Sequence, residues 1–259
     1  MTRLTLIAAT FAALILAGCD KEYDDDKTPP APPPTVVSAS GDLTTALNQF
    51  RTIIGDPLNT TPNQTVGRRE VNWDGAPVNV TNNNDFPLDF FNSTDPAVGN
   101  ARKRGLQYVG AVNSLRLDST NFVEIEATYA DNFKPFSNKK AITSINSNIT
   151  EIEFRVAGTS TPASVKGFGV VFSDVDQDNY TTIQFYDGNK SLGVFKAPVR
   201  SDANGHSFLG VHFPNDKVTR IKITAGNGVL GAGVKDISNN GNKDLVVFDD
   251  FFYSEPLAL

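Results

Sequence analysis

The stretch Tyr180–Ala197, YTTIQFYDGNKSLGVFKA, decides the fold of this chain. Two runs rich in β-branched and aromatic residues, Tyr180–Tyr186 and Ser191–Ala197, flank an Asp-Gly-Asn tripeptide at 187–189. Such a tripeptide between two such runs is typical of a tight hairpin turn, because glycine and asparagine tolerate the positive φ angles that the turn requires. The stretch therefore predicts two antiparallel strands.

Similar runs lie on both sides of this hairpin, separated by clusters of Asn, Asp, Gly and Pro. Many short strands without helices between them are typical of an all-β, antiparallel β-sandwich, and we expect one jelly-roll-like domain over residues 42–259. The other predicted strands are Phe122–Thr128, Glu151–Val156, Gly167–Ser173, Ser207–Phe213, Val218–Thr224 and Leu245–Tyr253.

One short accessory helix is expected over residues 42–55, at the start of this domain. Asp42 is a suitable N-cap and Gly55 a suitable C-terminal stop. Between them, apolar residues recur at helical spacing, which predicts one face that packs against the sandwich. These residues are Leu43, Leu47, Phe50 and Ile54.

Residues 1–18 have the features of an export signal, with Arg3 followed by the apolar run Leu4–Leu16. This run is too short for a membrane-spanning helix. The sequence Leu-Ala-Gly-Cys at 16–19 resembles the bacterial lipobox and contains the only cysteine of the chain. The resemblance implies removal of residues 1–18 and lipid attachment at Cys19. An ordinary secretory signal with an incidental cysteine is the alternative.

Residues 19–41 are expected to be an extended linker that follows the lipid anchor. Asp20–Lys27 is highly charged and Thr28–Pro34 is rich in proline, so neither segment can bury much apolar surface. The charged segment resembles the surface-export tether of lipoproteins from Bacteroidota, which implies the outer membrane, facing outward. In enterobacteria an Asp after the lipidated cysteine instead favours retention in the inner membrane.

The composition excludes several classes of function. The formal net charge is −6, and loss of Arg3 with the signal makes the mature chain still more negative, which argues against nucleic acid as a partner. Lipidation of Cys19 would leave no thiol for a disulfide, a thiolate metal site or a cysteine nucleophile. No apolar stretch after Leu16 is long enough to span a membrane, so lipid is the predicted membrane attachment.

Four sequence blocks resemble a family of exported bacterial β-sandwich proteins, some of which end in the PEP-type C-terminal sorting signal. The resemblance covers Leu43 to Pro256 and implies the fold and export, but no activity. This chain departs from the sorted members because no apolar helix and basic tail follow, and we expect the N-terminal lipid to replace that route. The blocks are 67–75, 167–176, 207–211 and 247–251.

A turn rich in oxygen ligands follows the run that ends at Ser173. Carboxylates and an amide so close together suit calcium, although the turn is not an EF-hand, because its sixth position is not Gly and Phe185 replaces the closing Glu. An ordinary solvated acidic turn is the alternative. The candidate ligands are Asp174, Asp176, Asp178 and Asn179.

A second candidate calcium site involves the last strand. Strict alternation would place Asp249 in one apolar stripe and Asp250 in the other. By analogy with jelly-roll carbohydrate-binding modules, in which a structural calcium often bridges the first and last strands, Asp74 could join one of them. In the alternative, these side chains cap turns or pair with Arg68 or Arg69.

Other residues could contact or process a glycan. Trp73 could stack on a sugar, although it shares a strand face with Val71, which favours the core. Two pairs of glutamates could act in glycoside hydrolysis, but polar alternation on a solvated sheet face is the simpler explanation for them. The pairs are Glu124 with Glu126 and Glu151 with Glu153.

Together these features favour a non-catalytic, lipid-anchored module that binds a glycan or another surface component. The alternatives are a glycan-processing enzyme on the same scaffold and a structural surface or matrix protein without a small ligand. No catalytic constellation is recognisable in the sequence, which favours binding or structure over catalysis.

Overall fold

The computed structural model describes residues 32–110, 114–202 and 205–259. The predicted signal peptide, the lipidation site Cys19 and the charged part of the linker lie outside these residues. No helix within the described ranges is both long enough and apolar enough to cross a membrane.

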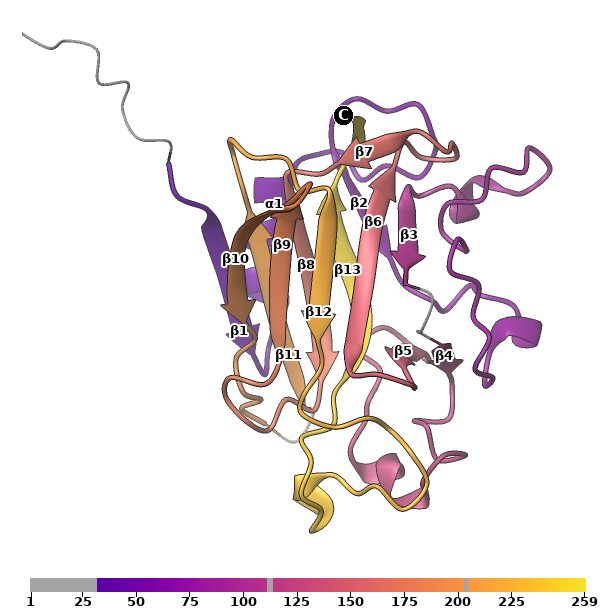
Figure 1. The fold of residues 1–259 in the computed structure, drawn as a ribbon, viewed down its shortest axis with the longest axis vertical. Helices are drawn as coiled ribbons and strands as arrows, with labels where there is room; N and C mark the ends of the chain where they lie inside the picture. The colour runs from indigo at the N-terminus through magenta and orange to yellow at the C-terminus, as the bar shows by residue number, and fades with distance from the viewer. Residues whose placement is uncertain (1–31, 111–113, 203–204) are drawn as a thin grey trace, which may run out of the picture. The chain divides into compact units, whose positions relative to one another are not determined.

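Two antiparallel seven-stranded sheets pack face to face, which confirms the predicted β-sandwich (Figure 1). The first sheet has the order β1 (Thr35–Ser40), β11 (His206–His212), β8 (Gly167–Ser173), β13 (Val247–Ser254), β5 (Ala141–Ser144) and β4 (Leu115–Asp118), with β2 (Arg68–Val71) beside β13. The second has the order β10 (Lys190–Lys196), β9 (Thr182–Asp187), β12 (Arg220–Thr224), β6 (Ile149–Arg155), β7 (Pro162–Ser164) and β14 (Leu257–Ala258), with β3 (Leu106–Val109) beside β6.

The β9–β10 hairpin forms where the sequence predicts it. Lys190 pairs with Asp187, and Gly188 between them has a φ of 56°. Alternate residues of β9, Ile183 and Phe185, are fully buried in the core between the sheets. The hairpin thus fixes which residues of the second sheet face the core.

The outer face of the second sheet is polar. Glu151 accepts from Arg220 of the neighbouring strand at 2.9 Å, and Glu153 pairs with Arg155 at 2.8 Å. The guanidinium of Arg220 also lies 3.9 Å from the ring centre of Tyr186. These ion pairs confirm that Glu151 and Glu153 belong to a solvated sheet face.

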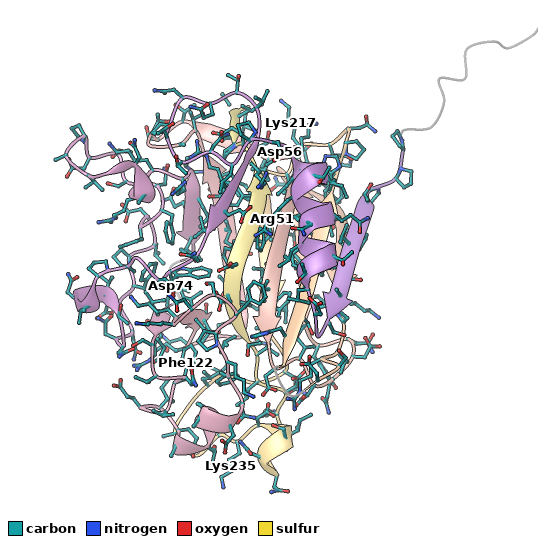
Figure 2. The ribbon with its side chains drawn as sticks, turned by 180° about the vertical axis from the view of Figure 1, so that it is seen from behind. Arg51, Asp56, Asp74, Phe122, Lys217 and Lys235 are labelled. Carbon is teal, nitrogen blue, oxygen red and sulfur yellow. The ribbon has the colours of Figure 1, made fainter. Side chains whose placement is uncertain are left out.

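The single α-helix of the described residues, α1 (Thr44–Ile54), packs against the outer face of the first sheet and runs along its strands (Figure 2). The N-cap is Leu43 and not Asp42 as predicted, but the side-chain Oδ1 of Asp42 accepts from the Thr44 backbone N–H at 2.9 Å and so contributes to the helix start. All four predicted apolar positions are buried, and they form a second core with side chains of β1, β8, β11 and β13.

Two glycines provide the space for this helix. Gly169 of β8 and Gly210 of β11 are cross-strand partners. A Cβ at Gly210 would lie 2.7 Å from the ring of Phe50, and one at Gly169 would lie 2.8 Å from it. Phe50 therefore occupies a notch in the sheet that side chains at these two positions would fill.

The folded part starts earlier than predicted, within the segment 19–41 that was expected to be linker. Thr35–Ser40 forms β1, which pairs with β11 from Thr35 opposite His212 to Ser40 opposite Ser207. The β-branched residues that follow the last proline can donate and accept ladder hydrogen bonds, which the proline-rich run cannot.

The predicted strand Phe122–Thr128 is wrong. Asn121 and Phe122 both have positive φ angles, which an extended strand excludes. The carboxylate of Asp118 accepts from the backbone N–H groups of Thr120 and Phe122 and stabilises a turn instead.

Four short 3₁₀ helices lie in the connections of the described residues. They are η1 (Val78–Val80), η2 (Asn100–Arg102), η3 (Ala127–Asp131) and η4 (Ile237–Asn239).

The predicted alternation along the last strand is wrong beyond Phe248. The register between β13 and β8 shifts between Phe248 and Phe251, and both of these rings lie in the core between the sheets. Phe252 instead packs in the core beneath α1. A β-bulge at Asp249 and Asp250 reverses the faces, because it adds one residue to β13 without a partner on β8.

Candidate metal site

Three carboxylates gather among the loops at one end of the sandwich. Asp174 and Asp176 follow β8, and Asp236 is the N-cap of η4 in the connection between β12 and β13. One oxygen of each lies within 4.8 Å of the others. Asp174 and Asp236 are fully buried, so the cluster could hold a metal ion away from solvent. Figure 1 shows η3 and η4 at this same end.

Local backbone geometry turns Asp174 into the cluster. Its φ of 73° ends the strand directly after Ser173, and its N–H donates to the Gly205 carbonyl at 2.8 Å. Asn132, which follows η3, donates from Nδ2 to Asp174 Oδ2 at 3.1 Å and to Ser238 Oγ at 2.5 Å. The bonds of Asp174 and Asn132 therefore join four parts of the chain.

Arg200 is the cation that contacts the cluster. Its Nη1 lies 3.1 Å from Oδ1 of Asp174, and its Nε donates to Oδ1 of Asp176. The contact with Asp174 has the distance of an ion pair but not the geometry of a hydrogen bond. Within the described residues, Asp174 Oδ1 and Asp176 Oδ2 are buried and receive no hydrogen bond. Asp176 Oδ2 is therefore available to a ligand, whereas Asp174 Oδ1 already faces the Arg200 guanidinium.

Asp236 and Asp244 complete the acidic environment. Asp236 accepts from the N–H and the hydroxyl of Ser238 and from the N–H of Leu245, each at 2.8 Å. Asp244 accepts from the N–H groups of Asp176 and Gln177 at 3.1 and 3.2 Å. These bonds fix the connection between β12 and β13 against the turn that follows β8.

The cluster has more negative charge than its surroundings balance. Burial raises the pKa of Asp174 to about 8, and the charges of Asp236 and Asp176 add to this, while Arg200 opposes it. Burial also raises the pKa of Asp244 to about 6, opposed by its two backbone hydrogen bonds. Four carboxylates against one guanidinium require either bound protons or a cation.

The structure brings together only part of the acidic turn predicted from the sequence. Asp174 and Asp176 lie in the cluster, whereas Asp178 and Asn179 are exposed. Asn179 donates to Asp178 at 2.9 Å and accepts from Lys196 on β10. The last two candidates therefore form the solvated turn that was the alternative interpretation.

Sequence reasoning missed Asp236, although a signal was present. Asp236, Ser238, Asn240 and Gly241 have the spacing of positions 1, 3, 5 and 6 of a calcium-binding loop, but Val247 stands in place of the closing glutamate. A Cβ at Gly241 would lie 1.8 Å from the carbonyl oxygen of Lys235, so the loop requires glycine at this position.

At the second predicted calcium site, the carboxylates of Asp249 and Asp250 form hydrogen bonds with the loop at residues 136–137. Asp249 is fully buried and accepts from the N–H groups of Phe136 and Ser137 at 2.5 and 3.3 Å. The Ser137 hydroxyl lies 3.1 Å from Asp249 Oδ1 and 2.6 Å from Asp250 Oδ1, and it can donate its proton to one of them. This arrangement matches the predicted alternative in which the carboxylates cap turns.

Burial raises the pKa of Asp250, and the nearby charge of Asp74 adds to this, but the Asp74 carboxylate itself accepts from the Lys139 N–H at 3.0 Å. Burial, followed by the charge of Asp250, raises the pKa of Asp249 to about 8. The two arginines predicted as alternative ion-pair partners of these carboxylates pair with other residues. Arg68 pairs with Asp56 and Glu70, and Arg69 pairs with Glu255.

Trp73 offers no surface to a sugar. It is fully buried in the core between the sheets, and its ring packs edge to face against Phe251 at 4.9 Å and Phe91 at 6.3 Å. The ligand-binding hypothesis for Trp73 is therefore wrong, and the core alternative holds. The ring is too large and apolar to leave in water beside so much aromatic surface.

The other glutamate pair does not form a catalytic site. Glu124 pairs with Arg116 at 2.6 Å, and Glu126 caps η3 by accepting from the Thr128 N–H. Both lie in the irregular segment that replaces the predicted strand, so they do not share a strand face.

Comparison with known proteins provides no relative: no family model, no curated protein and no solved structure matches the chain. The resemblance of the four sequence blocks to exported β-sandwich proteins remains a prediction. Function must therefore be inferred from the geometry of the acidic cluster and the surface around it.

Proposed function

We propose that this protein is a lipid-anchored, non-catalytic β-sandwich module of the bacterial envelope that binds a glycan or another surface component. A calcium ion at Asp174, Asp176 and Asp236 would hold its loop end rigid. The observation that carries this proposal is the buried acidic cluster, where hydrogen bonds join loops from four parts of the chain. Rigid loops lower the entropy that a ligand must remove on binding.

The chemistry of the cluster favours calcium. Its donors are carboxylate oxygens with no histidine among them, which suits a hard cation, and the Asp-x-Ser-x-Asn-Gly spacing supports the same ion. A divalent ion would also supply the positive charge that Arg200 alone does not provide. Calcium would bind in competition with protons on Asp174.

The burial of the carboxylates with raised pKa values favours binding over glycan processing. A general acid must reach the glycosidic oxygen, and Asp174 and Asp249 are both fully buried. The glutamates near the surface are held in ion pairs and caps. The remaining alternative is a structural surface or matrix protein. Such a protein would bind no glycan, which distinguishes it from the proposed module.

A glycan array tests this function directly. A protein starting at residue 32, which retains β1, would be applied to the array with 1 mM calcium and with chelator. We expect retention by a restricted set of glycans, stronger with calcium, and no cleavage of the retained glycans. A heat-denatured sample is the control. Failure to retain any glycan under either condition would contradict glycan binding, and release of shortened glycans would favour the enzyme.

A further inference from the structure

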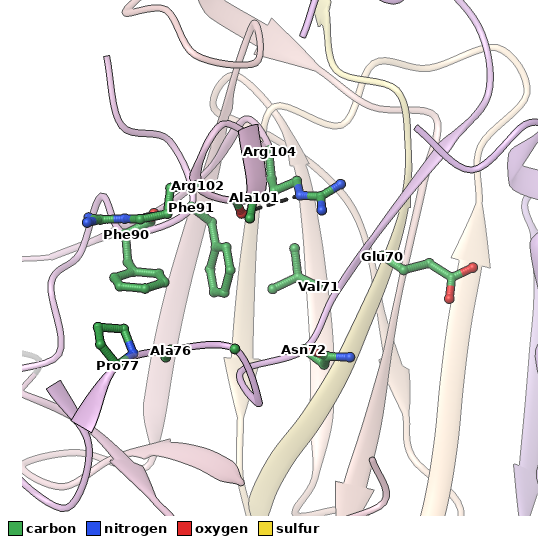
Figure 3. Close-up of a pocket in the computed structure, with 11 residues that line it drawn as sticks. Glu70, Val71, Asn72, Ala76, Pro77, Phe90, Phe91, Ala101, Arg102 and Arg104 are labelled. Atoms are coloured by element: carbon green, nitrogen blue, oxygen red, sulfur yellow. Dashed lines mark hydrogen bonds between the residues drawn. The ribbon is translucent and has the colours of Figure 1, made fainter. Parts of the chain in front are cut away.

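A cavity of about 250 Å³ lies beside the end of β2, and none of the carboxylates of the acidic cluster lines it. Its walls come from the end of β2, the turn at 75–77, residues 90–91 and the segment of η2 (Figure 3). This volume is slightly below the range of pockets for drug-sized ligands, so it suits a ligand about the size of one sugar ring.

The cavity has an apolar centre and a cation on each side. Figure 3 shows Phe90, Phe91 and Val71 between Arg102 and Arg104, whose guanidinium groups point to opposite sides. Both rings are mostly buried, and both line the cavity, so they give it an apolar wall.

The two arginines are held in place by neutral partners. Arg102 lies 4.1 Å from the ring centre of Phe90 and donates from Nε to the Phe90 carbonyl at 3.2 Å. Arg104 donates to the carbonyls of Asn59 and Ala101 at 2.8 and 3.4 Å. Within residues 32–110, 114–202 and 205–259, no carboxylate forms an ion pair with either arginine.

Among the described residues that line the cavity, the one acidic side chain is already neutralised. Glu70 accepts from both Arg51 and Arg68, at 2.9 and 2.8 Å. The cavity is therefore positive on a chain whose net charge is −6. Burial, together with the nearby charge of Arg69, lowers the pKa of Arg104, so an added negative charge would stabilise this cation.

We propose that this cavity binds a carboxylate-bearing sugar, such as a uronic acid within an acidic glycan. The carboxylate would accept from Arg104 or Arg102, and the ring would lie against Phe90, Phe91 and Pro77. Arginine suits a planar carboxylate because its donors form a fork of matching geometry. This inference rests on the proposed function and names the class of glycan that it takes.

Isothermal titration calorimetry with a glucuronate-containing disaccharide tests the inference, beside its neutral glucose counterpart, glucose 6-phosphate and inorganic phosphate. We expect the glucuronate ligand to bind at least about tenfold more tightly than the other three. Because the carboxylate would accept from one of the two arginines, at least one of Arg102→Gln and Arg104→Gln should weaken that binding by about tenfold or more, the range for one charged hydrogen bond. Lys222→Gln on the outer face of the second sheet makes the same charge change and should have no effect.

The outcomes separate this inference from the function on which it rests. Binding of neutral glycans on the array, without binding of the glucuronate ligand, would overturn the acidic-sugar site and leave the glycan module intact. Equal binding of phosphate and glucuronate would also overturn it, because the site would then recognise any anion. Absence of all glycan binding would overturn both proposals.

Discussion

Phe50→Ala is expected to destabilise the domain by about 3–5 kcal/mol and to lower its melting temperature by roughly 10 °C. Phe50 is fully buried and packs edge to face against Phe208, with ring centres 5.4 Å apart. Its notch is open because Gly169 and Gly210 have no side chains, and neither can expand to fill the space. The loss of folding free energy would thus include both the lost transfer free energy of the ring and the cost of the cavity that remains.

Chemical denaturation of the two proteins measures this effect. Val36→Ala is a suitable control, because Val36 lies on β1 in the same sheet but is 47% exposed, and we expect a change within about 0.5 kcal/mol. A loss below about 1 kcal/mol for Phe50→Ala would show that α1 contributes little to the fold and would contradict its role as the cover of the first sheet.

Glu255→Leu is expected to cost a similar 3–5 kcal/mol, because it leaves a buried cation without its counter-ion. Arg69 is fully buried, and its Nη2 lies 2.6 Å from the Glu255 carboxylate. Glu255 also accepts from Asn59 Nδ2 at 2.8 Å, and Arg69 donates to the Thr61 carbonyl at 3.0 Å. The pair thus ties the chain end to the segment before β2.

The double substitution Arg69→Met with Glu255→Leu separates charge from shape. Removal of both charges avoids the uncompensated cation, so we expect the double variant to recover more than half of the stability that Glu255→Leu loses. Equal instability of the single and double variants in a denaturant titration would show that lost packing, and not the buried charge, causes the effect.

Local patterns were sufficient to predict much of the fold. The β9–β10 hairpin and α1 follow from short-range periodicity and from turn residues, which act within a few positions of the chain. The face reversal in β13 could not be predicted in this way, because the bulge depends on which strands flank β13. Phe122 was assigned to a strand because apolar and β-branched residues surround it in the sequence. In the structure its backbone is left-handed, and a hydrogen bond from its N–H to Asp118 stabilises this conformation.

The candidate metal site was also predictable only in part, where its residues are close together in the sequence. Asp174 and Asp176 share one turn, so their acidic spacing is visible in the sequence. Asp236 belongs to another connection, and only the topology brings it beside them. Asp178 continues the acidic pattern but is exposed, since sequence alternation does not reveal which side chains turn inward. The buried ion pair of Arg69 and Glu255 was missed for the same reason, because the two residues are 186 positions apart in the sequence and only the fold brings them together.

Calorimetric titration of calcium into the protein starting at residue 32 tests the central claim most directly. We expect one ion per chain with a dissociation constant of about 10 μM, so that 1 mM calcium stabilises folding by about 2.7 kcal/mol. Asp236→Asn should weaken this binding at least about tenfold, whereas Asp178→Asn, which changes an exposed carboxylate of the same acidic turn, should leave it unchanged. Absence of binding heat together with a melting curve unaffected by calcium would contradict the site, as would loss of binding in Asp178→Asn but not in Asp236→Asn.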